Sequence, residues 1–142
     1  WDMSLNINAK AMLLCSQEAV KLMSGKGKIV TISSLGSRTY IPDYGAIGIS
    51  KSAVECLVRY LAVELAPKGI NVNCVSGGPI QTDALSMFPK YDQMTTECIK
   101  RTPMGRLGQP DDLGKVVMFL LSEQADWIVG QTLIADGGLS LF

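Results

Sequence analysis

The chain has 142 residues, of which 13 are basic and 13 acidic, so its formal net charge is zero. A balanced charge without a charged block offers no basic surface for nucleic acid and no polybasic patch for a membrane. The absence of histidine excludes a Ser-His-Asp triad, a Cys-His pair and a histidine-ligated zinc site built from these residues.

Two further patterns concern where the protein works. The longest strictly apolar run, residues 116–121, is far shorter than a membrane span, and no signal peptide is visible. The four cysteines stand singly, without a C-x-x-C pair, at Cys15, Cys56, Cys74 and Cys98. We expect them to be buried free thiols of a cytoplasmic protein, and we expect no metal site.

The first half of the chain predicts a helix, a strand and a second helix. Apolar residues recur at helical spacing over residues 4–23. The β-branched run at residues 29–32 predicts a buried parallel strand. A loop rich in Gly, Ser and Pro then leads to a second long helix over residues 46–65.

The second half continues this alternation. The expected elements are a strand over residues 70–76, two short amphipathic helices within 83–100, a helix over 111–121 and a last strand within 128–138. Strands that alternate with helices are typical of a doubly wound parallel sheet. We therefore expect residues 1–142 to form a single, partial α/β domain of the Rossmann type.

The main candidate site joins a serine pair, Ser33-Ser34, at a strand end to the helix that follows. Tyr44 stands at the mouth of this helix, and Lys51 lies two turns on, within ~20° of the same face and after a rise of ~10 Å. A hydroxyl, a phenol and an ammonium group at the carboxyl edge of a parallel strand form a proton-donor constellation. Tyr40 is another possible donor, but we favour Tyr44 because of Lys51.

This stretch resembles the short-chain dehydrogenase/reductase family, which places a serine at the end of this strand and a Tyr-x3-Lys pair in the next helix. Counting thirteen residues from Ser34 reaches Ile47, where the usual tyrosine would stand, with Lys51 four residues later. Here the tyrosine stands one turn earlier, as Tyr44-x6-Lys51. That spacing is similar to the enoyl-acyl-carrier-protein reductase branch, which reduces a carbon–carbon double bond rather than a ketone.

The resemblance implies that the chain is the carboxyl-terminal half of such a reductase. It begins at Trp1 rather than at Met, and it contains no glycine-rich fingerprint for a dinucleotide pyrophosphate. We expect the phosphate-binding half, with the residue that selects NAD or NADP, to precede residue 1. We also expect a homotetramer that pairs through the two long helices, as family members do.

The resemblance also assigns roles around an NADPH cofactor, with NADH as the alternative. Tyr44 would donate a proton or hydrogen bond to the enolate of a trans-2-enoyl thioester carried by acyl-carrier protein, and Lys51 would hold the nicotinamide ribose. Asn8, in a stretch similar to the family's Asn-x-Lys-Gly, would bind a water that relays protons to the lysine, or it is an ordinary helical asparagine. Ser34 would orient the substrate oxygen, or it would only cap the strand.

A loop after the predicted strand over residues 70–76 resembles the family's Pro-Gly-x-x-x-Thr loop, with Gly78-Pro79 in place of Pro-Gly. The resemblance implies that this loop and Ser33 bind the cofactor. The backbone of Ile80 would hold the nicotinamide carboxamide, and the Thr82 hydroxyl would reach the carboxamide or the pyrophosphate.

The amphipathic segment over residues 83–100 has two compatible interpretations. Its apolar side chains either pack on the core as a surface pair of helices or form a mobile lid over an acyl-chain pocket. The residues expected to bind the substrate are Leu35, Tyr40, Leu85, Met87 and Phe88.

Two other functions stay open at this point. Within enzymes, the rival is a 3-oxoacyl or other ketone reductase of the same family whose tyrosine has shifted. From another class, the isolated chain is a non-catalytic fragment whose two long helices pair with copies of themselves. The absent glycine fingerprint favours this second alternative.

Overall fold

The computed structural model describes residues 1–87 and 91–141, and in this part the chain forms an α/β structure around one parallel sheet. The sheet has the order β1-β2-β3, with strands Gly27–Ser34 (β1), Ile70–Gly77 (β2) and Thr132–Ala135 (β3). The α-helices are Asp2–Leu5 (α1), Ala11–Leu22 (α2), Gly45–Leu65 (α3), Asp83–Ser86 (α4), Tyr91–Arg101 (α5) and Pro110–Leu121 (α6). The predicted α/β class is confirmed, although β3 is much shorter than the predicted last strand.

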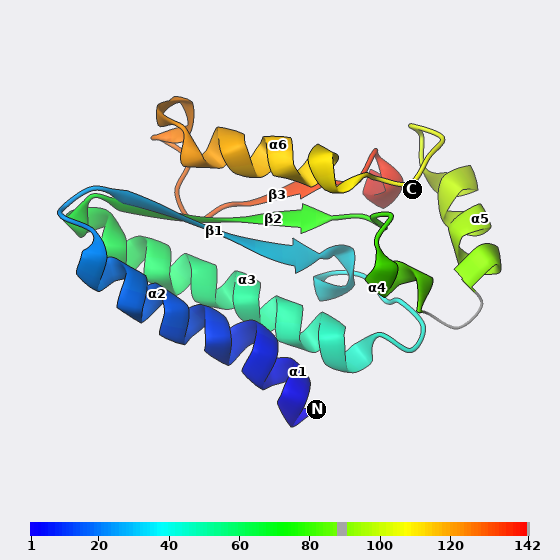
Figure 1. The fold of residues 1–142 in the computed structure, drawn as a ribbon, viewed down its shortest axis with the longest axis horizontal. Helices are drawn as coiled ribbons and strands as arrows, with labels where there is room; N and C mark the ends of the chain where they lie inside the picture. Colours follow the sequence, from blue (N-terminus) through cyan, green and yellow to red (C-terminus); the bar gives the residue numbers. More distant parts are fainter. Residues whose placement is uncertain (88–90, 142) are drawn as a thin grey trace.

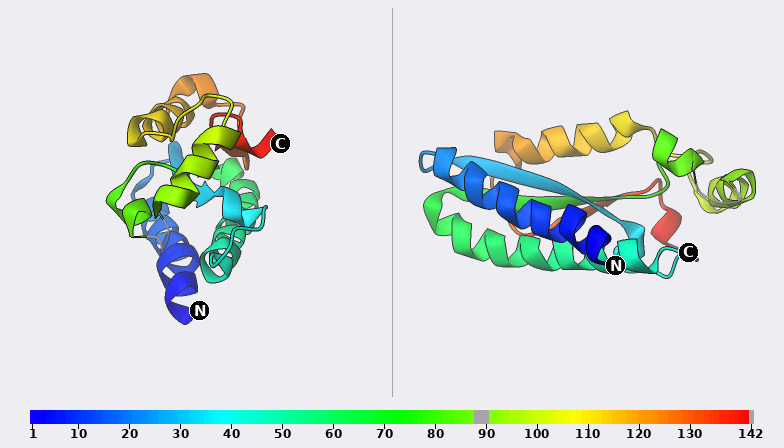
Figure 2. Two further views of the ribbon diagram at one scale, coloured as in Figure 1. Left: turned by 90° about the vertical axis from the view of Figure 1, so that its right-hand side faces the viewer. Right: turned by 60° about the horizontal axis from the view of Figure 1, so that its bottom comes forward.

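Helices cover both faces of the sheet (Figures 1 and 2). The helices α2 and α3 lie side by side on one face, and α6 lies on the other. The central strand β2 is buried along almost its whole length, because helices exclude water from both of its faces. None of the helices in the described ranges is long and apolar enough to cross a membrane.

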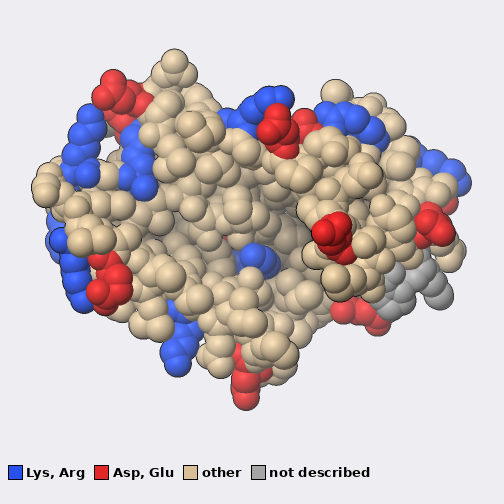
Figure 3. Space-filling model, viewed as in Figure 1, with Lys and Arg blue, Asp and Glu red and all other residues tan. Residues whose placement is uncertain are grey.

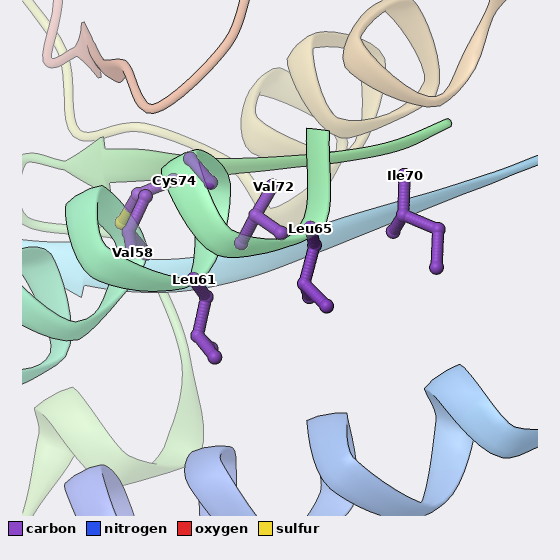
Figure 4. Packing of buried hydrophobic residues seen from close by; sticks show 7 residues of the cluster. Val58, Leu61, Leu65, Ile70, Val72 and Cys74 are labelled. Carbon is purple, nitrogen blue, oxygen red and sulfur yellow. The ribbon is translucent and has the colours of Figure 1, made fainter. Parts of the chain in front are cut away.

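The larger core lies between β2 and the first two long helices (Figure 4). Val72 and Cys74 point from β2 toward α3, and Val58 and Leu65 meet them from the helix. A second core on the other face joins Val75 of β2 to α6 and the turn after it. Successive strand residues point to opposite faces, so one strand supplies both cores.

The first predicted helix is interrupted. Between α1 and α2 the residues Asn6–Lys10 form a π-helical turn, in which the Ala11 N–H donates to the carbonyl of Asn6 five residues earlier. Such single turns are frequent at functional sites. The turn brings the side chain of Asn8 against α3, where its Nδ2 donates to the Ser50 Oγ at 2.9 Å.

The carboxyl ends of the strands meet at one edge of the sheet. Ser33 pairs in register with Ser76, Ser34 with Gly77, and Gly77 with Ala135. The helices α4 and α5 lie beyond this edge, past the arrowheads of β1 and β2 (Figure 1). Open parallel sheets bind ligands at this edge.

The cysteines are less buried than expected. All four are free thiols, but only Cys74 is buried, while Cys15 is exposed and Cys56 and Cys98 are intermediate. The prediction of buried thiols is therefore wrong for three of them, because they lie on outward or boundary faces of their helices. Among the described residues, no three His, Cys, Asp or Glu side chains gather as metal ligands.

Candidate functional site

A cavity of about 630 Å³ opens at the carboxyl edge of the sheet. Its walls come from the end of β1 and the loop before α3, from the end of β2 and the loop after it, and from α4 and α5. Leu113 of α6 and the turn near the carboxyl terminus complete the wall. The lining residues are Ile32, Ser33, Ser34, Leu35, Thr39, Tyr40, Ile41, Pro42, Tyr44, Gly77, Gly78, Pro79, Ile80, Thr82, Ala84, Leu85, Met94, Glu97, Cys98, Arg101, Leu113, Leu139 and Ser140. The volume lies in the usual range for small-molecule sites.

Charges of both signs are scattered over the face of the molecule in Figure 3. That face is hollowed near its centre, and one Lys or Arg side chain lies in the hollow. The view shows no large patch of a single sign.

Tyr44 stands at the start of α3 and lines the cavity. Asp43, at a φ of 59°, turns the chain into the helix, and Asp is one of the few residues that tolerates this left-handed conformation. The Tyr44 carbonyl accepts the Gly48 N–H at 2.7 Å. Its ring packs against Gly36, where a Cβ would lie 2.5 Å from a ring carbon. The ring therefore lies directly against the backbone of Gly36, where any side chain would collide with it.

Lys51 lies two turns further along α3, beside the cavity rather than on its wall. Its Nζ donates to the carbonyl of Ile32 at 3.0 Å, and Ile32 does line the cavity. Burial lowers the pKa of the Lys51 ammonium, and the interaction with Cys74 opposes this shift. A direct approach of Lys51 to a bound cofactor stays a prediction.

Asn8 reaches the residue that precedes Lys51. Its contact Ser50 donates in turn to the Ile47 carbonyl at 2.7 Å. The π-helical turn and α3 are thus joined next to the lysine, as a relay from Asn8 would require. The relay itself stays a prediction.

The two serines at the end of β1 differ in direction. Ser34 lines the cavity, and its Oγ accepts the Gly36 N–H at 3.4 Å. The Ser33 hydroxyl instead donates to Glu55 on α3 at 2.7 Å, and Ser33 also lines the cavity. Its contact with a cofactor stays a prediction. Glu55 was missed by sequence reasoning; the available signal was a lone carboxylate on the apolar face of a long helix.

Glu55 is only 5% exposed, yet it is charged. Burial alone would raise the pKa of Glu55, but hydrogen bonds from Ser37, Ser33 and Arg38 outweigh it and hold the pKa below its usual value. Cys74 on β2 also faces this carboxylate. Burial, reinforced by Glu55, raises the pKa of Cys74 to about 11, so the thiol stays neutral at acidic and neutral pH.

The lowered pKa of Glu55 makes its contribution to stability depend on pH. The contribution is complete above the unfolded glutamate pKa of about 4.3 and is lost as the pH falls through the lower pKa of the folded state. We therefore expect Glu55→Gln to lower the free energy of unfolding clearly at pH 7, and by less at about pH 3. Urea unfolding of the wild type and of Glu55→Gln at the two pH values measures this difference. An equal loss of unfolding free energy at both pH values would contradict the prediction.

The loop after β2 is held in place by backbone hydrogen bonds to Gly108. The Pro79 carbonyl accepts the Gly108 N–H at 3.0 Å, and the Gln81 N–H donates to the Gly108 carbonyl at 2.8 Å. Thr82 begins α4, where its Oγ accepts the Leu85 N–H at 3.3 Å. Gly78, Pro79, Ile80 and Thr82 share one wall of the cavity. The binding of a cofactor by this loop stays a prediction.

Some of the residues predicted for the substrate pocket line the cavity, and others do not. Leu35, Tyr40 and Leu85 line the cavity, whereas Met87 is 80% exposed and lies outside it. Met87 closes the short helix α4 and points to solvent in this structure, and Phe88 lies outside the described residues. The remaining cavity wall comes from α5, through Met94, Glu97, Cys98 and Arg101, and from Leu113 of α6 and the turn at Leu139 and Ser140. Only the apolar face of α5, with Met94, was visible in the sequence pattern.

Known proteins resemble this chain over almost its whole length. Residues 1–140 match the family described as Enoyl-(Acyl carrier protein) reductase. The chain is 44% identical over 142 residues to 1-cyclohexenylcarbonyl-CoA reductase of Streptomyces collinus, a match that covers 99% of this chain and 51% of that protein.

Solved structures extend the likeness to the fold. Enoyl-acyl carrier protein reductase of Bacillus cereus, solved with NADP+ and indole naphthyridinone, has a TM-score of 0.90 at 30% identity, covering 95% of this chain and 52% of that one. A 3-oxoacyl-[acyl-carrier protein] reductase of Brucella melitensis with bound NAD has a TM-score of 0.85 at 31% identity, covering 94% and 49%. The chain thus spans about half the length of the relatives it matches.

Proposed function

Because the chain belongs to the short-chain dehydrogenase/reductase family, we propose that it is the carboxyl-terminal half of an NAD(P)H-dependent reductase that saturates the double bond of a trans-2-enoyl thioester. The observation that carries this proposal is the displaced tyrosine. Tyr44, and not the residue at position 47, lies on the cavity wall with Ser34. The likeness to an enoyl-acyl carrier protein reductase and to a cyclohexenylcarbonyl-CoA reductase supports the same chemistry.

The cavity fits the nicotinamide end of a dinucleotide. It lies at the carboxyl edge of a parallel sheet, and a pinned Gly-Pro loop forms one wall. In our proposal the Ile80 backbone and Thr82 hold the carboxamide end, and the Lys51 ammonium holds the ribose hydroxyls. When bound, NADPH supplies the hydride that adds to the β-carbon of the substrate.

Tyr44 then acts on the thioester oxygen of the substrate. As negative charge builds on the thioester oxygen, the phenol donates a hydrogen bond or its proton to that oxygen. Leu85 and Met94 place apolar surface around the acyl chain.

A ketone reductase is the second candidate, and Ser34 is the observation that favours it. Its side chain lines the cavity at the strand end where ketone-reducing relatives keep their serine. The likeness to a 3-oxoacyl reductase points the same way. In that case Ser34 would orient a substrate carbonyl and Tyr44 would protonate an alkoxide.

One assay separates the two reductases. The complete protein to which this chain belongs would be mixed with NADPH and either crotonyl or acetoacetyl thioester, and the loss of NADPH absorbance followed. We expect turnover with crotonyl thioester and little with acetoacetyl thioester. The reverse preference would replace our proposal with the ketone reductase. Carrier-protein and coenzyme A thioesters of the same acyl group would identify the carrier.

We also propose that the protein is an oligomer that pairs through its long helices and works in the cytoplasm. Exposed apolar side chains lie on α2 and α3, at Leu14, Tyr60 and Val63, and on the segment that precedes α2, at Met3 and Ile7. Titration of the isolated 142-residue chain with NADPH tests the non-catalytic alternative, which measurable binding would rule out.

A further inference from the structure

We infer that Glu55 is a positioning residue, whose carboxylate holds the turn after β1 against α3 and so sets where Ser34 and Tyr44 stand on the cavity wall. This inference rests on the proposed function for its kinetic consequence. Its structural consequence can be measured without any substrate.

The carboxylate collects three donors from consecutive parts of one segment. Ser33 at the end of β1 donates to Oε1 at 2.7 Å, and Ser37 in the following 3₁₀ turn donates to the same oxygen at 2.5 Å. Arg38, just after the turn, donates through Nε to Oε2 at 3.0 Å. Both oxygens are therefore used, and the three donors lie between the end of β1 and Arg38, ahead of Tyr44 in the sequence.

The same helix face makes two more contacts with the turn. The Ser52 hydroxyl donates to the Ser37 carbonyl at 2.6 Å. At Gly48 the backbones approach so closely that a Cβ would lie 2.4 Å from the Gly36 carbonyl oxygen. Positions 48, 52 and 55 lie four and then three residues apart, which puts them on one face of a helix. Glu55 is the far end of this line of contacts.

The near side of the turn faces the cavity. Ser34 and Leu35 line it, and Gly36 supports the ring of Tyr44. Any shift of the turn would therefore change the separation of Ser34 and Tyr44. The hydrogen bonds to the Glu55 carboxylate come from Ser33, Ser37 and Arg38, so Glu55 would act on this separation through the turn. In Figure 1 this turn is the coiled segment that joins the arrowhead of β1 to the loop before α3.

The arrangement requires a group that only accepts hydrogen bonds. Two hydroxyls and a guanidinium all donate here, and an ionised carboxylate offers about four acceptor positions and no donor. The amide of glutamine has nearly the same shape as the carboxylate, but an NH₂ group replaces one of the two oxygens. Glu55→Gln thus keeps the volume and places a donor against a donor.

The kinetic test uses the complete protein with crotonyl thioester and NADPH. We expect Glu55→Gln to lower kcat roughly tenfold or more, as positioning errors do, while the KM for NADPH stays within about threefold because the loop after β2 is pinned by Gly108 instead. Glu64→Gln, on an exposed position of the same helix, is the matched control and should behave as wild type. Ile70→Val, at the far end of β2 from the cavity, serves as a mildly destabilised control.

The second readout is hydrogen exchange of the Arg38 and Thr39 amides, both of which donate to the Leu35 carbonyl in the turn. We expect Glu55→Gln to speed their exchange roughly tenfold or more, and Glu64→Gln and Ile70→Val to leave it near the wild-type rate. Unchanged exchange overturns the inference. A fall in kcat no greater than that of an equally destabilised Ile70→Val protein also overturns it. If wild type reduces neither thioester, the proposed function fails, and faster exchange in Glu55→Gln still supports the positioning role.

Discussion

We expect Tyr44→Phe in the complete protein to lower kcat for a trans-2-enoyl thioester by ~10²–10⁴-fold, the usual worth of a positioned proton donor. The substitution removes the phenol oxygen alone. The ring that packs on Gly36 is kept, so the wall of the cavity should keep its shape. NADPH consumption at saturating cofactor and substrate measures the effect.

Two further tyrosine variants make this test specific. Tyr60→Phe changes an exposed position on the outer side of α3 and should retain wild-type kcat. Tyr40→Phe removes the other phenol that lines the cavity. If Tyr40→Phe shows the large loss and Tyr44→Phe does not, the proton donor is Tyr40 and our assignment is wrong.

Lys51→Met should lower kcat/KM for NADPH by ~10²–10³-fold, because it removes a preorganised positive charge from the site. Methionine keeps an unbranched chain of similar length, so the packing between α3 and β1 is largely preserved. The ammonium that now holds the Ile32 carbonyl is lost, along with its donors for the ribose hydroxyls. Steady-state kinetics at varied NADPH, with a fluorescence titration of cofactor binding, measures both effects.

The control for this change lies just beyond the carboxyl end of α3. Lys68 is exposed in the 3₁₀ turn Ala66–Lys68, and Lys68→Met should leave the kinetics unchanged. If Lys51→Met also falls within about threefold of wild type, the lysine takes no part in cofactor binding. The account of the site would then be limited to Tyr44 and the loop after β2.

Local patterns in the sequence determined the α/β architecture and the position of the site. A β-branched run followed by a long apolar-faced helix specifies a strand and its crossover, because the 2-residue and 3.6-residue periods differ. The carboxyl ends of parallel strands share one edge, so Ser34, Tyr44 and the Gly78–Thr82 loop could be brought together without coordinates. The shift of the tyrosine from position 47 to 44 is likewise a property of the sequence alone.

Contacts between distant segments were decided only by the tertiary structure. Glu55 has no local signal for its three donors, since they come from residues 17 to 22 positions earlier that meet it only when β1 packs on α3. The π-helical turn that carries Asn8 to Ser50, the exposure of Met87 and the single buried cysteine have the same origin. Periodicity tells which face of a helix is apolar, but the neighbour that covers each position is known only once the whole chain has packed.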